Sequence, residues 1–171
     1  MAVIEKFLGQ RVEVPEDRRY DVKQGLWGKV DDQAVVFGLT QPALVLHGGV
    51  KDIDWLVDDN RIVERGETVL FAVTGKILYI EAPVAGSVRF HRSLREDPAR
   101  IAADPYEKGW LFSIEPDADV DPAYASLAVL DTYLEGLRRS EGGKNPEGIK
   151  GGVSGMCKAV YSGIGAQKIQ P

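Results

Sequence analysis

The stretch TVLFAVTGKILYIEAPVAGSV, residues 68–88, decides the fold. Two apolar runs, LFAV and ILYI, flank Thr74, Gly75 and Lys76. Runs rich in Val, Ile, Leu, Phe and Tyr on both sides of a short break that contains glycine predict a β-hairpin. Gly75 is expected to supply the positive φ that tight hairpin turns need. The turn is therefore expected to hold the ammonium group of Lys76 at its tip, pointing into water.

Further strand-like segments lie on both sides of this hairpin. Residues 25–30 and 34–39 flank Asp31 and Asp32, a turn signal, and predict a second hairpin. The remaining segments are residues 12–14, 50–57, 87–90 and 110–114. Together they predict about eight short strands with turn residues between them. This pattern is typical of a mainly β fold, a sandwich or flattened barrel.

Two helices are expected. Thr40 and Pro42 are an N-cap and a first-turn residue, and they predict a short helix over residues 41–46. Asp121 and Pro122 are likewise an N-cap and a first-turn residue. The longer segment after them has leucines at helical spacing and ends in two arginines. A C-terminal helix over residues 121–139 is therefore predicted.

Composition places the chain among ordinary globular proteins. It has 171 residues, of which 44% are hydrophobic and 27% charged. No apolar run approaches the ~20 residues of a membrane span, and the first residues lack the features of a signal peptide. The net charge of −5 argues against a nucleic-acid-binding surface. We expect a cytoplasmic protein that binds neither membranes nor nucleic acid.

The residues that most often carry redox, metal or nucleophilic chemistry are few. Cys157 is a single cysteine, so an internal disulfide and a multi-cysteine zinc site are excluded. It is either a redox-active thiol, favoured by the adjacent Lys158, or a small apolar residue, which base rates favour. His47 and His91 show no arrangement with a nucleophile and an acid that resembles a hydrolase triad. No metal site is expected.

A second stretch, ADPYEKGWLFSIEP at residues 103–116, resembles the D-P-Y-x-x-G-W-L block of the glycine cleavage system H protein family. Trp27 and residues 38–40 also resemble family elements near its start. The lysine hairpin followed by A-P-V-x-G is similar to the carrier-lysine hairpin of biotinyl/lipoyl domains. The resemblance implies a hybrid barrel-sandwich of short antiparallel strands, closed by the C-terminal helix.

The resemblance also divides the chain. It covers residues 14–139, which implies one H-protein-like lipoyl domain. Residues 1–13 form an N-terminal lead with little signal. Residues 140–171 are expected to be a Gly-rich linker followed by a C-terminal extension. This extension is too apolar for a purely solvating tail, so it is expected to dock on the domain or on a partner.

The function that the resemblance implies is that of a lipoyl carrier. Lipoate would be attached through an amide to Lys76, which Thr74 and Gly75 flank. The arm would shuttle an aminomethyl group, or another thiol-bound intermediate, between partner enzymes. Those partners would be a decarboxylase, an aminomethyltransferase, a dihydrolipoyl dehydrogenase and a lipoate ligase. The chain would then be no enzyme itself and would hold no catalytic residue.

Two departures from the family motif keep another hypothesis open. The motif has a glutamate three residues before the lysine, where this chain has Val73. Lys76 and Pro83 are also one residue closer together than in the motif; counting back from Pro83 places Gly75 at the carrier position and Ala72 at the glutamate position. Lys76 would in this case be a solvated turn lysine, and the chain an unmodified H-protein-like interaction module.

Two further comparisons bear on the group that the lysine would carry. Thr74-Gly75-Lys76 resembles the S-G-K of the lipoate-binding proteins linked to sulfur oxidation, which share the H-protein fold. A biotin carrier would have methionines around the lysine, but Gly75 and Ile77 are there instead. Lipoate is therefore favoured over biotin.

Overall fold

The structure is a computed structural model that describes residues 1–147. Its strands are β1 (Ala2–Phe7), β2 (Gln10–Val14), β3 (Arg19–Asp21), β4 (Leu26–Asp31), β5 (Ala34–Leu39), β6 (Asp52–Trp55), β7 (Ile62–Val63), β8 (Thr68–Val73), β9 (Ile77–Glu81), β10 (Gly86–Phe90) and β11 (Phe112–Glu115). The helices are α1 (Gln41–His47), the 3-10 helix η1 (Arg92–Arg95), α2 (Ala99–Ala103), α3 (Val120–Ala125), α4 (Leu130–Arg139) and α5 (Glu141–Lys144).

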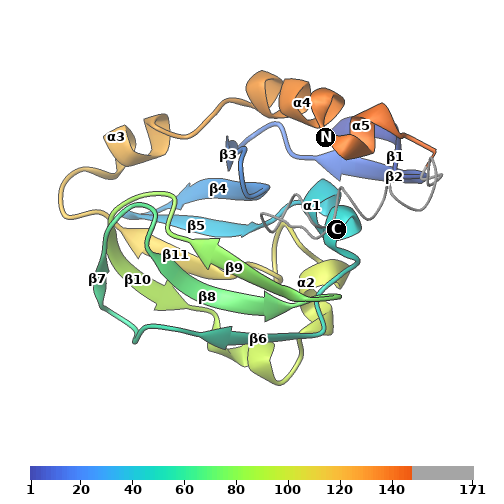
Figure 1. The fold of residues 1–171 in the computed structure, drawn as a ribbon. Helices are drawn as coiled ribbons and strands as arrows, with labels where there is room; N and C mark the ends of the chain where they lie inside the picture. The colour runs from blue at the N-terminus through green and yellow to red at the C-terminus, as the bar shows by residue number, and fades with distance from the viewer. Residues whose placement is uncertain (148–171) are drawn as a thin grey trace.

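Three antiparallel sheets make up most of this part of the chain (Figure 1). The largest has the order β3-β4-β5-β11-β10-β7, and a three-stranded sheet has the order β6-β8-β9. The hairpin of β1 and β2 lies beside α4 and α5 (Figure 1). The prediction of a mainly β fold is confirmed, with more strands than the sequence indicated.

The main hydrophobic core joins the two larger sheets. Phe37 on β5 and Phe112 on β11 stack with their ring centroids 5.3 Å apart. Leu70 on β8 and Ile80 on β9 are buried in the same cluster. A smaller core packs β1 and β2 against β3, β4 and α4, with the rings of Tyr20 and Tyr133 stacked at 4.7 Å. The hairpin of β8 and β9 is therefore anchored in the larger core.

Helix α1 forms where the sequence predicts it. The side chain of Thr40 accepts a hydrogen bond from the backbone N–H of Ala43 at 3.2 Å, which satisfies a donor that the first helical turn leaves open. Gly48 ends the helix in the left-handed conformation, with φ of 77°. The hydroxyl groups of Thr40 and Tyr133 lie 2.6 Å apart, so the start of α1 is tied to α4.

The prediction of one helix over residues 121–139 is wrong. The segment forms α3 and α4, and Asp119 rather than Asp121 caps the first of them. Between the two helices, Ala128 exchanges two backbone hydrogen bonds of 2.8 Å with Tyr20 on β3. A residue that pairs with a strand in this way has left the helical hydrogen-bond pattern, because its backbone groups bond outside the segment.

The segment after α4 also differs from the expected linker. Glu141–Lys144 form α5, and the carbonyl oxygen of Pro146 accepts a hydrogen bond from Gly9 at 2.6 Å. Lys6 on β1 pairs with Glu147 at 2.9 Å. Residues up to Glu147 therefore pack against the N-terminal hairpin. The rest of the predicted extension, including Cys157, lies outside the described residues.

Two other segments are shorter or shifted relative to the prediction. The strand expected over residues 50–57 is limited to β6, and the strand expected over 110–114 begins two residues later, as β11. Within residues 1–147, no helix is both long enough and apolar enough to cross a membrane.

Candidate functional site: the lysine hairpin and its neighbours

A three-residue turn joins β8 to β9, with Val73 opposite Ile77. The backbone N–H of Thr74 donates to the carbonyl oxygen of Lys76 at 2.7 Å, and the Thr74 hydroxyl lies 3.3 Å from the Lys76 N–H. Gly75 is exposed, but its φ is not positive, so the expectation that this glycine supplies a left-handed turn is wrong. The turn closes through the buried Thr74 side chain instead.

Lys76 lies at the tip of the hairpin, as the sequence predicts. It is half-buried rather than fully in water. Burial lowers the pKa of its ammonium group from the ordinary value of 10.5, because desolvation disfavours the charged form.

His47, the last residue of α1, is an electrostatic neighbour of Lys76. Burial lowers the pKa of His47, and the positive charge of Lys76 lowers it further. No short sequence motif connects these two residues, because His47 reaches the hairpin only through the fold. Both effects favour the neutral form of the histidine next to the positively charged lysine.

Asp52 on β6 lies directly opposite Val73 on β8. Residues paired in this way have their side chains on the same face of a sheet, about 5 Å apart at Cβ. The backbone N–H of Ile53 donates to the Asp52 carboxylate at 2.8 Å, and Arg95 lies 3.9 Å from it. An acidic group therefore stands beside the position where the family motif has glutamate. No signal in the sequence pairs these two residues.

The segment after β9 fixes the base of the hairpin. Ala82 exchanges backbone hydrogen bonds with the turn before β8, to Glu67 at 2.8 Å and from Gly66 at 2.9 Å. Ala82 and Val84 are buried in the main core. Gly86, with φ of 151°, passes so close to Glu115 that a Cβ atom would collide with its backbone. The A-P-V-A-G stretch therefore anchors the base of the hairpin, which is the end opposite the tip.

The D-P-Y block is tied to residues from the N-terminal part of the domain. The Tyr106 hydroxyl donates to the carbonyl oxygen of Glu13 and accepts from the N–H of Gln41 at 2.9 Å. The indole N–H of Trp27 donates to the carbonyl oxygen of Pro105 at 2.9 Å. These contacts give the block a structural role.

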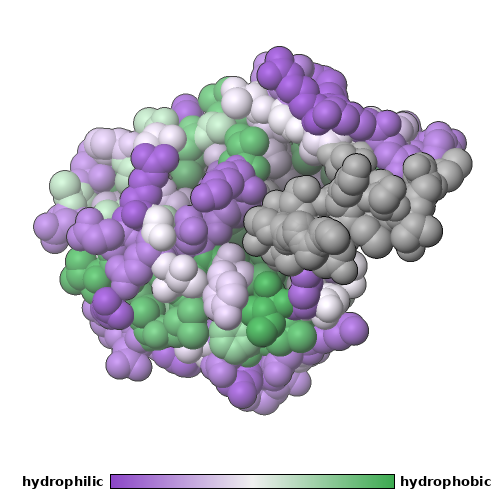
Figure 2. All heavy atoms as spheres, in the orientation of Figure 1, coloured by the Kyte–Doolittle hydropathy of each residue, from purple (hydrophilic) through white to green (hydrophobic). Residues whose placement is uncertain are grey.

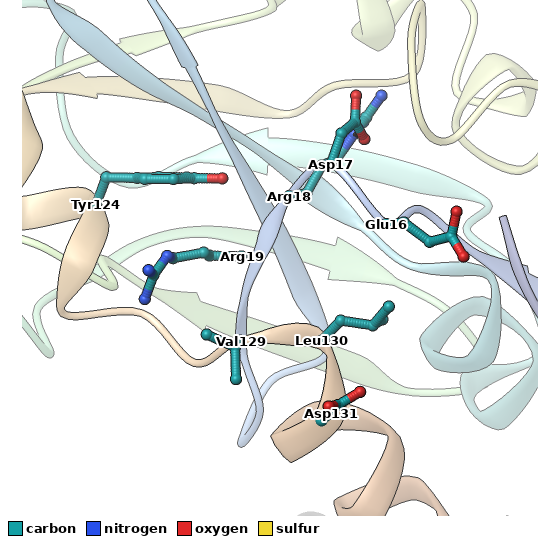
Figure 3. Close-up of a pocket in the computed structure, with 8 residues that line it drawn as sticks. All are labelled: Glu16, Asp17, Arg18, Arg19, Tyr124, Val129, Leu130 and Asp131. Atoms are coloured by element: carbon teal, nitrogen blue, oxygen red, sulfur yellow. Dashed lines mark hydrogen bonds and ion pairs between the residues drawn. The ribbon is translucent and has the colours of Figure 1, made fainter.

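The pocket in Figure 3, of about 320 Å³, lies between β3 and the segment containing α3 and α4. Its two arginines are engaged within the protein. Arg18 lies over the Trp27 ring and donates to the carbonyl oxygen of Tyr106 at 2.6 Å. Arg19 extends toward the face of Tyr124 (Figure 3) and donates to the Leu127 carbonyl oxygen at 3.2 Å. The two arginines therefore have structural roles in holding this region together.

His91 also has a packing role. Its ring stacks on Trp110 with centroids 4.4 Å apart, and Nδ1 lies 2.7 Å from the Trp110 carbonyl oxygen. Burial lowers the pKa of His91. Among residues 1–147, no three His, Cys, Asp or Glu side chains are grouped so that they could hold a metal ion.

The fold and the site together define a β-rich domain that presents one lysine at the tip of an anchored hairpin. A model of the glycine cleavage H-protein family matches residues 18–138. The chain is 33% identical over 127 residues to the glycine cleavage system H protein of an Anaeromyxobacter species, an alignment that covers 72% of this chain and 98% of that protein. It is 34% identical over 107 residues to the H protein of Thermus thermophilus, covering 61% of this chain and 82% of that protein.

A solved structure gives the same result. The crystal structure of a glycine cleavage system H protein from Mycobacterium marinum superimposes with a TM-score of 0.60 and 27% sequence identity. The match covers 71% of this chain and 97% of that one. The chain belongs to the glycine cleavage H-protein family.

Proposed function

We propose that this protein is a lipoyl carrier whose lipoate is bound through an amide to Lys76. One observation carries the proposal: in a member of the H-protein family, the β8–β9 hairpin holds a lysine at its tip. Lipoate would supply a dithiolane at the end of a long arm, able to hold an intermediate through sulfur. The protein's own residues would present and orient that arm, and none of them would be catalytic.

The residues at the tip fit an acylated lysine. A Cβ atom added at Gly75 would have no neighbouring atom within 4 Å, so an approaching ligase has space there. The lowered pKa of Lys76 favours the nucleophilic amine. The carboxylate of Asp52 offers a recognition group close to Val73. The hairpin thus combines an accessible lysine at its tip with an acidic group on the neighbouring strand.

Carrier function implies a set of partner enzymes. A decarboxylase would load the arm with an aminomethyl group derived from glycine. An aminomethyltransferase would remove that group, and a dihydrolipoyl dehydrogenase would reoxidise the dithiol that remains. A lipoate ligase would modify Lys76 beforehand.

A second candidate function rests on the changed motif. Val73 occupies the position of the family's glutamate, and the hairpin is one residue shorter before Pro83. A shift of one residue in a hairpin changes which face a side chain occupies. With this change, a ligase would not recognise Lys76, and the domain would act as an unmodified interaction module.

In vitro modification distinguishes the two functions. The full chain is incubated with a lipoate ligase, ATP and lipoate, and the modified peptide is identified by mass spectrometry. The carrier proposal predicts one lipoyl group on Lys76, absent from Lys76→Arg and retained by Lys51→Arg. Absence of modification in the wild-type chain, with an H protein modified in parallel, would favour the interaction module.

A further inference from the structure

Strand β9 forms one edge of the three-stranded sheet, whose order is β6-β8-β9. In the part of the chain that the structure describes, no strand pairs with its outer side. The side chain of Gln24 occupies only the end of this edge, where it accepts from the N–H of Glu81 at 2.7 Å and donates to the Glu81 carbonyl oxygen at 3.0 Å. Along an antiparallel strand, the backbone N–H and C=O groups of successive residues point alternately toward one neighbouring strand and away from it. The backbone groups of Ile77 and Tyr79 therefore point to the outer side of β9, as those of Glu81 do.

The side chains along this edge are apolar. Ile77 is 48% exposed and Tyr79 is 57% exposed. On the same face of the sheet they adjoin Val73 and Phe71, and the rings of Phe71 and Tyr79 lie 6.2 Å apart. We call these four residues the carrier face. Figure 2 shows hydrophobic residues over the region where Figure 1 draws β8 and β9.

An unpaired edge strand with apolar side chains is expected to be covered by another segment or chain. Natural proteins protect edge strands with charged residues, prolines or bulges, because an open edge pairs with other chains. The residues from Ile77 to Ile80 include no charge and no proline. By contrast, β1, which lies beside the apolar groove lined by Val3 and Leu134, carries Glu5 and Lys6. The β9 edge therefore has the weaker protection of the two.

The sequence beyond Glu147 has the chemistry of such a cover. Residues 148–171 contain three lysines and no acidic residue. Removing these three charges from the net charge of −5 leaves −8 on residues 1–147, so the two parts attract each other. Val160 and Tyr161 favour strand conformation, and Met156 and Ile164 add apolar surface around them.

The length of the chain permits the contact. Nine residues separate Glu147 from Cys157, and at ~3.3 Å per residue they span about 30 Å when extended. A domain of roughly 150 residues has a radius of gyration of about 15 Å. A linker of twice that length can therefore carry the segment after it to surfaces well away from Glu147.

We propose that residues 156–164 of this chain add to the outer edge of β9 and cover the carrier face. The backbone groups of Ile77 and Tyr79 would pair with the added segment, and its apolar side chains would cover Tyr79 and Ile77. The inference does not depend on whether Lys76 is modified.

Amide hydrogen exchange of the full chain, followed by NMR, tests the pairing. The N–H groups of Ile77 and Tyr79 are expected to be protected. The double substitution Val160→Asp and Tyr161→Asp is expected to speed their exchange by about tenfold or more, the effect of a loss of roughly 1.4 kcal/mol. Equal exchange rates in the two proteins would overturn the inference. The N–H of Ile114, in the main core, serves as the internal reference.

The single cysteine allows a test of where the segment lies. A nitroxide on Cys157 is expected to broaden the amide signals of residues 77–80, relative to a diamagnetic label. Tyr79→Lys is expected to abolish this broadening, and Ile62→Lys is the matched control, because Ile62 is 63% exposed on β7 at the edge of the other sheet.

Three results of the labelling experiment would contradict the inference. Broadening at Val3 and Phe7 would place the segment in the groove beside β1. Broadening only when labelled chains are mixed with isotope-enriched unlabelled chains would show that a second copy covers the edge. No broadening at any amide, together with unprotected Ile77 and Tyr79 amides, would show that the segment does not dock on this edge.

Discussion

Asp52 faces Val73 across the β6–β8 pair, so its carboxylate lies on the same side of the sheet as the position where the family motif has glutamate. An acidic group therefore stands on the strand next to this position, although the position itself holds valine.

This relationship predicts that Asp52 promotes lipoylation. Asp52→Asn is expected to lower the initial rate of Lys76 modification by a lipoate ligase by about tenfold, the effect of one lost charge-assisted hydrogen bond. Val73→Glu in the Asp52→Asn background is expected to restore the rate. Asp31→Asn, at an exposed turn, is the matched control. A rate that Asp52→Asn leaves unchanged would contradict the assignment.

The charge on Lys76 is expected to control the pKa of His47. The pKa of this histidine is lowered by burial and by repulsion from Lys76. Lipoylation, or the substitution Lys76→Gln, removes the positive charge and so favours protonated His47. The pKa of His47 should rise in both proteins, as followed by NMR titration of the imidazole signals. The pKa of His91, which does not depend on Lys76, should stay constant. A constant pKa for His47 would show that the two groups are not coupled.

The Tyr106 hydroxyl is expected to stabilise the domain. Tyr106→Phe leaves the N–H of Gln41 and the carbonyl oxygen of Glu13 without this partner. The free energy of unfolding should fall by about 1–3 kcal/mol, measured by urea denaturation. Tyr79→Phe, at an exposed tyrosine, should change it by less than about 0.5 kcal/mol. Similar losses in both variants would argue against the structural role of the D-P-Y block.

Two glycines are expected to respond differently to the same substitution. A Cβ atom on Gly109 would lie 2.8 Å from the carbonyl oxygen of Asp104 and 2.9 Å from that of Arg100. Gly109→Ala should therefore destabilise the domain by about 1–3 kcal/mol through overpacking. Gly75→Ala should be neutral or slightly stabilising, because the space is open and φ is not positive. Thermal unfolding of both variants checks this, and equal melting temperatures would contradict it.

The sequence predicted those parts of the fold that depend on local patterns. The hairpin around Lys76 and the capped helix α1 follow from apolar runs, a threonine cap and glycines close together in the chain. The break between α3 and α4 was not predictable in this way, because it results from pairing of Ala128 with Tyr20 across the domain. Leucines at helical spacing continue through that break, so the pattern alone indicates one helix.

Of the candidate site, too, only the part that is contiguous in the sequence was predictable. Lys76 is recognisable because the turn and its flanking strands are contiguous in sequence. Asp52 and His47 belong to the site only through sheet pairing and helix packing, which no short motif encodes. The conformation of Gly75 was mispredicted because Thr74 closes the turn with its side chain, which removes the need for a positive φ.

The most direct test of the carrier assignment is the intact mass of the protein purified from its native host grown with lipoate, followed by mapping of the peptide that contains Lys76. A lipoyl carrier is expected to show a mass increase equal to one lipoyl group, located on Lys76. An unmodified mass, when another H protein from the same cells is found lipoylated, would contradict it.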